Sequence, residues 1–238
     1  PYFDNIQLRN LSYAYPPTKE QDHIFTVGPV NLTFRKGELV FITGGNGSGK
    51  STFLKLLTGL YTPKGGQIVL DTGLKNKEET IVTPLLYQQY RNLFTVIFTD
   101  FHLFDKLYGV DKVNPKVVNR LLENMELSNE KTSFKNGSFT NIHLSSGQKK
   151  RLALTISLME DKEVYIFDEV ASDLDPEFRD KYYYELIREL KERNKTVIVV
   201  SHDRHYWTVP DRLLEMKNGA IRELSRKEIN ALLTVNPL

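Results

Sequence analysis

One stretch of nine residues decides the fold of this chain: Gly44-Gly45-Asn46-Gly47-Ser48-Gly49-Lys50-Ser51-Thr52. It matches the pattern Gly-x4-Gly-Lys-Ser/Thr, follows the apolar run Leu39-Val40-Phe41-Ile42 and precedes a helical run that ends near Gly59. A strand, a glycine-rich loop and a helix in this order predict a loop that cradles phosphates. The alternative is an ordinary glycine-rich turn, but the full pattern arises by chance in only about one in a hundred chains of this length.

The residue types of this loop explain why phosphate would bind there. Glycines let the backbone turn tightly and point its N–H groups inward, and the helix presents its positive end to an anion. Lys50 would reach the β- and γ-phosphates of a nucleotide, and the Ser51 hydroxyl would bind a Mg²⁺ ion that bridges them. The loop alone does not separate kinases, GTPases, helicases and other nucleotide hydrolases, so the rest of the chain must decide.

Three apolar runs predict strands that are buried on both faces of a parallel sheet covered by helices. They are Leu39-Val40-Phe41-Ile42, Val164-Tyr165-Ile166-Phe167 and Val197-Ile198-Val199-Val200. Small or polar residues follow each run, namely Thr43-Gly44, Asp168-Glu169 and Ser201-His202. Because open α/β sheets bind ligands at the carboxyl ends of their strands, we expect the functional site along that edge.

The rest of the chain suggests helices around this sheet. Residues 100–150 combine helical patches with loop-like segments, which indicates an inserted helical subdomain. Asp175-Pro176-Glu177 is expected to open a further helix, with an aspartate cap, proline at the first position and an acidic first turn.

Composition narrows the classes of function. The 238 residues carry a formal net charge of +2, far from the strongly basic surface that a nucleic-acid partner requires. The absence of cysteine excludes disulfides and thiolate metal sites and favours a reducing compartment. No apolar run reaches the roughly 20 residues that span a bilayer. Because the chain starts at Pro1, almost directly on a strand pattern, we expect it to be cut from a longer polypeptide.

Four further motifs decide the family: Leu144-Ser145-Ser146-Gly147-Gln148, Val164-Tyr165-Ile166-Phe167-Asp168-Glu169, Ser172-Asp173-Leu174-Asp175 and Ser201-His202-Asp203. In this order, after the phosphate loop, they resemble the ATP-binding cassette (ABC) nucleotide-binding domain. The match runs from an aromatic residue in segment 11–15 to Gly219. Segment 98–104, together with Ser-Gly-Gln-Lys-Lys-Arg and Asp-Pro-Glu-Phe-Arg, resembles the cyclic-peptide and siderophore exporters of that family.

The resemblance implies a fold, an activity and partners. The fold is an α/β RecA-like P-loop core with a parallel sheet and an N-terminal antiparallel β-layer, formed by residues 1–98 and 154–238. Residues 99–153 form a helical subdomain that carries the signature motif. The activity is Mg²⁺-dependent ATP hydrolysis that powers export. The resemblance further implies that two such domains enclose two ATP molecules between them. It places the domain at the cytoplasmic face of the membrane, beneath a transmembrane domain that is expected to be fused before Pro1.

Single residues receive roles by the same resemblance. Asp168 would hold Mg²⁺ through its water shell, and Glu169 would activate the attacking water; the alternative is two acidic residues that merely end a strand. His202 would hydrogen-bond to the γ-phosphate, unless it is a structural histidine. Tyr15 would stack on adenine, although an aromatic residue near a strand more often packs in a core.

The motif 144–148 implies contact with a second copy of the domain. Ser145, Ser146, Gly147 and Gln148 would bind the γ-phosphate of the ATP held by the partner's phosphate loop, and Ser172 and Asp175 belong to the segment called the D-loop. Lys149, Lys150 and Arg151 lie at the start of a helix, where the helix dipole disfavours cations. A docked anion would relieve that conflict; the alternative is a solvated basic face.

The chain departs from the family pattern at three places. Where most members have a glutamine that contacts Mg²⁺, our alignment puts Thr99, followed by Asp100. We expect the Thr99 hydroxyl to lie near the metal and Asp100 to turn aside, because a carboxylate near the γ-phosphate would be repelled. Ser146 replaces a glycine and Val170 a proline, and we expect both to be tolerated.

An aromatic cluster and three rival functions remain open. Phe98, Phe101, Phe104 and Tyr108 would form the groove that receives the membrane domain, or would pack the junction with the helical subdomain. The rival functions are a soluble ABC ATPase outside transport, an importer subunit and a nucleotide switch without hydrolysis. A missing coiled-coil insertion argues against the first rival, and the presence of Glu169 against the last.

Overall fold

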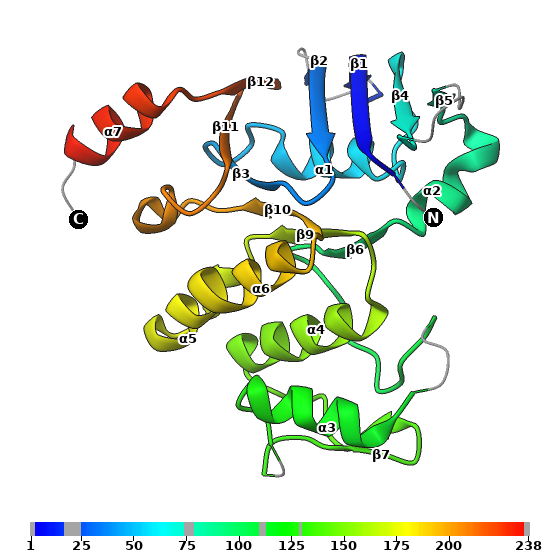
Figure 1. Ribbon diagram of the computed structural model, residues 1–238, viewed down its shortest axis with the longest axis vertical. Helices are drawn as coiled ribbons and strands as arrows, with labels where there is room; N and C mark the ends of the chain where they lie inside the picture. The colour runs from blue at the N-terminus through cyan, green and yellow to red at the C-terminus, as the bar shows by residue number, and fades with distance from the viewer. Residues whose placement is uncertain (1–2, 17–24, 74–78, 110–112, 129, 236–238) are drawn as a thin grey trace.

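The computed structural model describes residues 3–16, 25–73, 79–109, 113–128 and 130–235 (Figure 1). Its central sheet has six strands in the order β12-β11-β3-β10-β9-β6. In that order the strands are Ala220–Glu223, Arg212–Lys217, Leu39–Thr43, Thr196–Val200, Val164–Asp168 and Phe94–Ile97. All neighbours pair in parallel except β12, which is antiparallel to β11. Every residue of β3, β9 and β10 is buried, which confirms the parallel sheet predicted from the three apolar runs.

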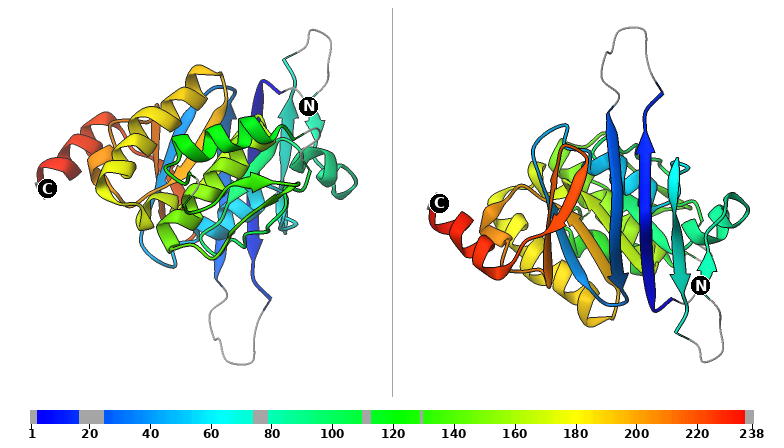
Figure 2. Two further views of the ribbon diagram at one scale, coloured as in Figure 1. Left: turned by 90° about the horizontal axis from the view of Figure 1, so that it is seen from below. Right: turned by 90° about the horizontal axis from the view of Figure 1, so that it is seen from above.

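A second, antiparallel sheet forms the N-terminal layer. Its order is β2-β1-β4-β5, with bounds Thr26–Arg35, Asn5–Ala14, Gly65–Asp71 and Thr80–Ile81. Seen from above, β2, β1 and β4 lie side by side over the rest of the molecule (Figure 2). Helix α1 (Lys50–Leu57) packs between the two sheets, where Phe53 meets Phe34 of β2 with ring centroids 6.4 Å apart. The predicted β-layer is thereby confirmed.

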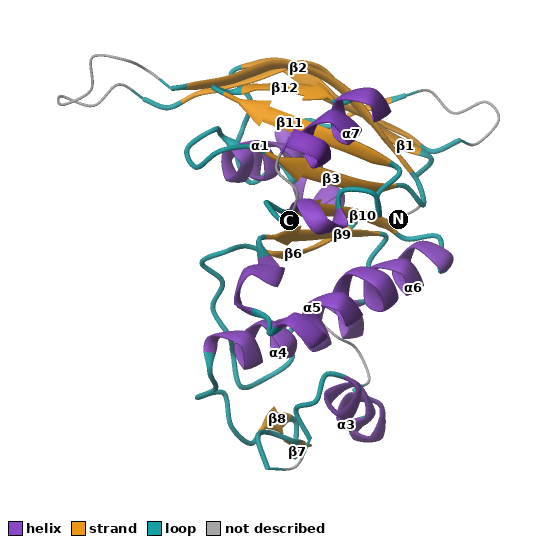
Figure 3. Cartoon of the chain, turned by 90° about the vertical axis from the view of Figure 1, so that its left-hand side faces the viewer, coloured by secondary structure: helices purple, strands orange, loops and turns teal. Residues whose placement is uncertain are grey.

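The other face of the parallel sheet is covered by helices, so that the molecule is built in layers (Figure 3). These are α4 (Ser146–Glu160), α5 (Pro176–Lys181) and α6 (Ile187–Glu192). Beyond them lie α3 (Pro115–Asn124) and the small hairpin of β7 (Phe134–Lys135) and β8 (Ser138–Phe139). Short helical elements occupy Pro84–Leu86, Tyr87–Arg91, Val170–Asp173 and Arg204–Tyr206, and α7 (Arg226–Val235) closes the described chain.

The helical region shares one apolar core with the sheet. Leu122 of α3, Phe134 of β7 and Leu152 of α4 belong to the same buried cluster as Phe41 and Phe167 of the sheet. Helix α4 runs through residues 153 and 154, so the boundary drawn there lies inside a helix rather than at a loop. The division into 1–98 with 154–238 as the RecA-like core and 99–153 as the helical signature subdomain therefore stays a prediction.

The helix predicted after Asp175 begins as expected and then changes its winding. The Asp175 side chain accepts a hydrogen bond from the Phe178 N–H at 3.0 Å, and Pro176 is the first helical residue. A π-helical turn at Tyr182–Leu186 then separates α5 from α6. Among the described residues, no helix combines the length and the apolar character needed to cross a membrane.

Candidate nucleotide-binding site

The predicted phosphate loop joins β3 to α1 at the carboxyl edge of the parallel sheet. Gly44 has φ +148°, and a Cβ atom there would lie 2.1 Å from the Met216 carbonyl oxygen, so this position requires glycine. Gly49, the residue before α1, has a left-handed backbone, and no side chain caps the start of this helix. The N–H groups of the first turn of α1 are consequently left to an anion, which is the arrangement expected of a phosphate site.

Lys50 lies inside the loop that precedes it. Its side chain is 6% exposed, and its ammonium donates to the carbonyl oxygens of Gly44 and Gly45, at 2.8 and 3.1 Å. The Nζ atom is 3.9 Å from a carboxylate oxygen of Glu169. Burial lowers the pKa of Lys50, while the charges of Glu169 and Asp168 act to raise it. A phosphate in the loop would give this buried cation an anionic partner.

Asp168, at the end of β9, has the surroundings of a cation ligand. Its Oδ2 atom accepts a hydrogen bond from the Ser51 hydroxyl at 2.9 Å, and its buried Oδ1 atom has no hydrogen-bond partner in the described structure. Burial raises the pKa of Asp168, and the bond from Ser51 opposes that rise. A hydroxyl and a carboxylate, completed by phosphate oxygens and water, suit Mg²⁺, which prefers oxygen ligands and keeps several waters.

Glu169 and His202 come from neighbouring strand ends and meet. The imidazole Nε2 atom lies 2.9 Å from a carboxylate oxygen of Glu169. Glu169 has a left-handed backbone, with φ 54°, and its N–H donates to the Val200 carbonyl oxygen at 3.1 Å. The sequence placed each residue after a buried strand, and the pairing of β9 with β10 brings them into contact.

Thr99 lies next to Asp168 in the structure. It comes two residues after the end of β6, and its hydroxyl lies 3.3 Å from the Asp168 carbonyl oxygen. Asp100, the next residue, is exposed. Thr99 also lines a cavity of about 780 Å³ that opens over the phosphate loop. The residues around this cavity are Tyr15, Pro16, Phe25, Asn46, Gly47, Gly49, Lys50, Ser51, Thr52, Thr99 and Glu169. One cavity thus collects residues from segments that flank strands of both sheets.

Tyr15 lies at the mouth of that cavity in a fixed orientation. Its hydroxyl is 2.9 Å from the Thr52 hydroxyl, and its ring is 37% exposed. Tyr13 is held in a stack on Tyr61, with centroids 4.9 Å apart, and both rings meet Tyr15 edge-on. Tyr15 rather than Tyr13 therefore offers a ring to a base. Sequence reasoning missed Tyr61 and Phe25, although Phe25 directly precedes the alternating pattern of β2.

The residues 145–148 do not line the cavity; they begin α4. Ser145 caps the helix, accepting from the Gln148 N–H at 3.4 Å, and Gln148 accepts from the Ser145 N–H at 3.2 Å. Ser145 and Ser146 are exposed. A Cβ atom on Gly147 would lie 2.6 Å from the Asp173 carbonyl oxygen, so the start of α4 packs closely on the turn 170–173.

The D-loop residues contact their own chain. The Ser172 hydroxyl donates to the Glu169 carbonyl oxygen at 2.8 Å, and Asp175 pairs with Arg151. Arg151 also pairs with Glu126 at 2.7 Å. The Phe178 N–H and the Arg151 charge lower the pKa of Asp175. Of the three cations after Gln148 only Lys149 is exposed, so a solvated basic face does not describe Lys150 and Arg151.

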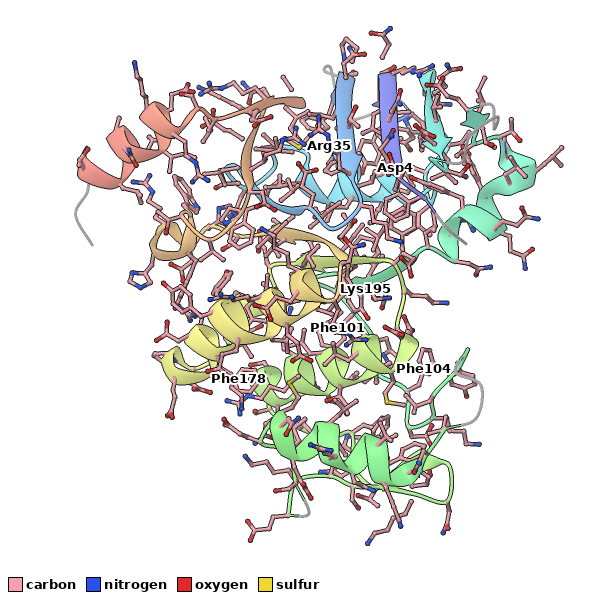
Figure 4. The ribbon with its side chains drawn as sticks, in the orientation of Figure 1. Asp4, Arg35, Phe101, Phe104, Phe178 and Lys195 are labelled. Atoms are coloured by element: carbon pink, nitrogen blue, oxygen red, sulfur yellow. The ribbon has the colours of Figure 1, made fainter. Side chains whose placement is uncertain are left out.

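The aromatic segment after Thr99 forms a second cavity on another part of the surface. This groove has a volume of about 530 Å³ and lies between β6, residues 101–108 and α4. Phe104 and Tyr108 are 56% and 65% exposed, whereas Phe101 packs against the main core (Figure 4). Phe101 packs the junction, as one of the two expectations stated, whereas the rings of Phe104 and Tyr108 face solvent and line the groove. Phe98 packs in the core around α1 instead.

A family model described as ABC transporter matches residues 27–172, which include the phosphate loop, the signature, Asp168 and Glu169. The chain belongs to the ABC transporter family. The ATP-binding protein SyrD of Pseudomonas syringae pv. syringae is 40% identical over 91% of this chain, which spans only 38% of that protein. The energy-coupling factor transporter ATP-binding protein EcfA1 of Mesomycoplasma hyopneumoniae is 30% identical over 91% of this chain and 79% of its own.

Two solved structures share the fold of this ABC domain. A bacterial Atm1-family ABC exporter with ATP bound matches 99% of this chain and 40% of its own, with a TM-score of 0.76 and 20% identity. A post-hydrolysis dimer of an ATP-binding cassette with ADP and Pi matches 92% of this chain and 99% of its own, with a TM-score of 0.72 and 24% identity. The RecA-like fold is thereby confirmed, and membership of the family makes the chain an ABC-type ATPase domain.

Proposed function

We propose that this ABC domain hydrolyses Mg²⁺-bound ATP in the 780 Å³ cavity and thereby powers export by a membrane transporter. The observation that carries the proposal is the meeting of five side chains at one sheet edge. Lys50 and Glu169 are 3.9 Å apart, Glu169 and His202 are 2.9 Å apart, and Ser51 is bonded to Asp168. Glycine-rich loops occur without catalysis. This set, however, combines a cation that can bind phosphate, ligands for a metal ion and a general base.

The binding steps belong to the loop and its neighbours. The N–H groups at the start of α1 and the Lys50 ammonium would hold the outer phosphates, and Tyr15 would stack on the base. Ser51 and Asp168 would hold Mg²⁺, whose charge, when it is bound, offsets the charge that develops on the phosphates. Thr99 lies close enough to Asp168 to bind a water of that ion, in place of the amide that most members use.

The chemical step belongs to Glu169 and His202. The Glu169 carboxylate would take a proton from the water that attacks the γ-phosphorus, while the bond from the phosphorus to the bridging oxygen breaks and ADP leaves. His202 lies 2.9 Å from that carboxylate and would orient it, and would donate to a γ-phosphate oxygen. The position of Glu169 is fixed by its backbone bond to Val200, so the base is held before substrate arrives.

Phosphate release from ATP tests this function directly. With MgCl₂ present, we expect the purified chain to release phosphate at a rate of the order of 0.1–10 per second. Because Ser51 and Asp168 need the cation to offset phosphate charge, EDTA should lower that rate at least about a hundredfold, and added Mg²⁺ should restore it. A rate unaffected by EDTA would contradict the assigned role of Ser51 and Asp168.

We further propose that two copies of the domain close on two ATP molecules. The support is that Ser145, Ser146, Gly147 and Gln148 lie outside the cavity of their own chain and that Ser145 and Ser146 are exposed. The D-loop residues lie close to the same surface. The Ser172 hydroxyl donates to the Glu169 carbonyl oxygen, and Asp175 pairs with Arg151 of α4. The related cassette solved with ADP and Pi is itself a dimer.

Gly147→Ala should weaken that closure selectively. An added Cβ atom would lie 2.6 Å from the Asp173 carbonyl oxygen and would shift the start of α4. We expect the dimer seen by light scattering with ATP, in a Glu169→Gln background, to weaken at least about tenfold, with ATP binding to the monomer changed less than about threefold. Lys149→Ala, at an exposed neighbour, is the matched control. Equal dimerisation of the two variants would refute the role of Gly147.

The transporter itself is proposed from the groove and the relatives. The exposed rings of Phe104 and Tyr108 would receive a transmembrane domain, and this domain would then lie at the cytoplasmic face of the cell membrane. The 40% identity with SyrD and the shared fold with an Atm1-family exporter favour export, with cyclic peptides or siderophores as the proposed cargo class. About six membrane spans encoded before Pro1 would support a fused exporter. An unfused ATPase subunit, as EcfA1 suggests, is the second candidate.

A further inference from the structure

A buried cation lies behind the nucleotide site and has no part in the steps above. Lys150, in the first turns of α4, is 3% exposed, and its Nζ atom has no hydrogen-bond partner among the described residues. Burial lowers the pKa of Lys150, while the carboxylates of Asp173, Asp168 and Glu169 favour its ammonium form. A buried charge without hydrogen bonds is costly, so a purely structural role would be better served by an uncharged side chain.

Lys150 has two kinds of neighbour, acidic groups and an aromatic ring. The acidic groups that act on it belong to the nucleotide site and to the turn that follows it. Its Nζ atom also lies 5.1 Å from the centre of the Phe101 ring, within the range of a cation–π contact. Phe101 in turn lines the groove of about 530 Å³. Lys150 therefore bridges the hydrolytic site and the surface proposed to receive the membrane domain.

The backbone around Lys150 is fixed, whereas the segment with Phe101 is irregular. Arg151, the next residue, is held by ion pairs to Glu126 and Asp175, and Gly147 abuts Asp173. Residues 98–104 lie in neither helix nor strand. A change in the electric field at the ammonium would consequently move the flexible side chain of Lys150 and the Phe101 ring that it contacts. Helix α4 itself would stay in place.

We propose that Lys150 is a positioning residue that links the charge of the nucleotide site to the position of Phe101 in the groove. The inference rests on the proposed function of the site. When nucleotide and cation are bound, the charges of the phosphates and of the cation would be added beside Asp168 and Glu169, so the electric field at Lys150 would change. In a low-dielectric interior such a change is felt over several ångströms. The ammonium would then shift its position between these acidic groups, Asp173 and the Phe101 ring.

A fluorine label on Phe101 tests the link without relying on turnover. 4-Fluorophenylalanine is placed at position 101 in a Glu169→Gln background, and its ¹⁹F resonance is recorded with and without Mg²⁺ and ATP. We expect a shift on ATP addition that falls by at least half in Lys150→Met. Lys150→Arg, which keeps the charge, and Lys149→Met, at an exposed neighbour, should retain the shift.

The outcomes distinguish a failure of the proposed link from a failure of the proposed function. Binding of a fluorescent ATP analogue is measured in each variant and should differ from the background protein by less than about threefold. If ATP binds and the Phe101 shift is the same in Lys150→Met, or is absent from the background protein, the link is refuted and the hydrolytic site stands. If the background protein binds no ATP, the proposed function is refuted, and the link, which rests on that function, is refuted too. Should Lys150→Met not fold, loss of the shift in Lys150→Arg would also refute the link.

Discussion

Glu169→Gln is expected to lower the rate of phosphate release about 10²- to 10⁴-fold, because an amide cannot take the proton of the attacking water. Shape and volume at the site are kept, so ATP should still bind and should accumulate uncleaved. The measurement is single-turnover hydrolysis of radiolabelled ATP, which separates the chemical step from binding and product release. The His202 contact at 2.9 Å remains available to the amide, so the geometry around the switch histidine should persist.

The control for this variant is Glu177→Gln, at an exposed position in the first turn of α5. It removes one negative charge elsewhere on the chain and should leave turnover within about twofold, as surface substitutions usually have small effects. If the two variants hydrolysed ATP at equal rates, Glu169 would have no place in the mechanism.

Lys50→Met should weaken ATP binding by about 2–5 kcal/mol, or roughly 30- to 5,000-fold. Lys50 is buried inside the phosphate loop, where its ammonium is 2.8 Å from the Gly44 carbonyl oxygen and would be the partner of the outer phosphates. Methionine fills a similar volume, so the loss reports on charge rather than on packing. Titration with a fluorescent ATP analogue measures the affinity.

Lys64→Met serves as the comparison, since Lys64 is exposed and does not line the cavity. Urea denaturation of both variants checks that Lys50→Met is folded. Unchanged ATP affinity in folded Lys50→Met would contradict the placement of the phosphates over this loop.

The parts of the fold that the sequence predicted are those with local signals. Buried strands β3, β9 and β10 are continuous apolar runs, and the phosphate loop is a fixed spacing of residues, so both are visible without tertiary information. The sequence placed Glu169 and His202 each after a buried strand, whereas their contact depends on the pairing of β9 with β10. The strand order β12-β11-β3-β10-β9-β6 did not follow, because it depends on crossovers that no local pattern encodes.

The parts that were missed depend on contacts between distant segments. Tyr61 fixes Tyr13 and so leaves Tyr15 free to face the cavity, a choice made by packing and not by either strand pattern. Lys150 lies in a run of three cations that is equally typical of a solvated face. Its burial arises because α4 packs on β6, on the turn 170–173 and on Phe101, which is 49 positions earlier in the numbering.

A structure of the chain with Mg²⁺ and a non-hydrolysable ATP analogue tests the central claim most directly. The account predicts the triphosphate against the N–H groups of residues 44–52, Mg²⁺ between the phosphates and Ser51 with Asp168, and the Glu169 carboxylate directed at the water beside the γ-phosphorus. An analogue bound elsewhere, or a Glu169 carboxylate turned away from every phosphate, would contradict it.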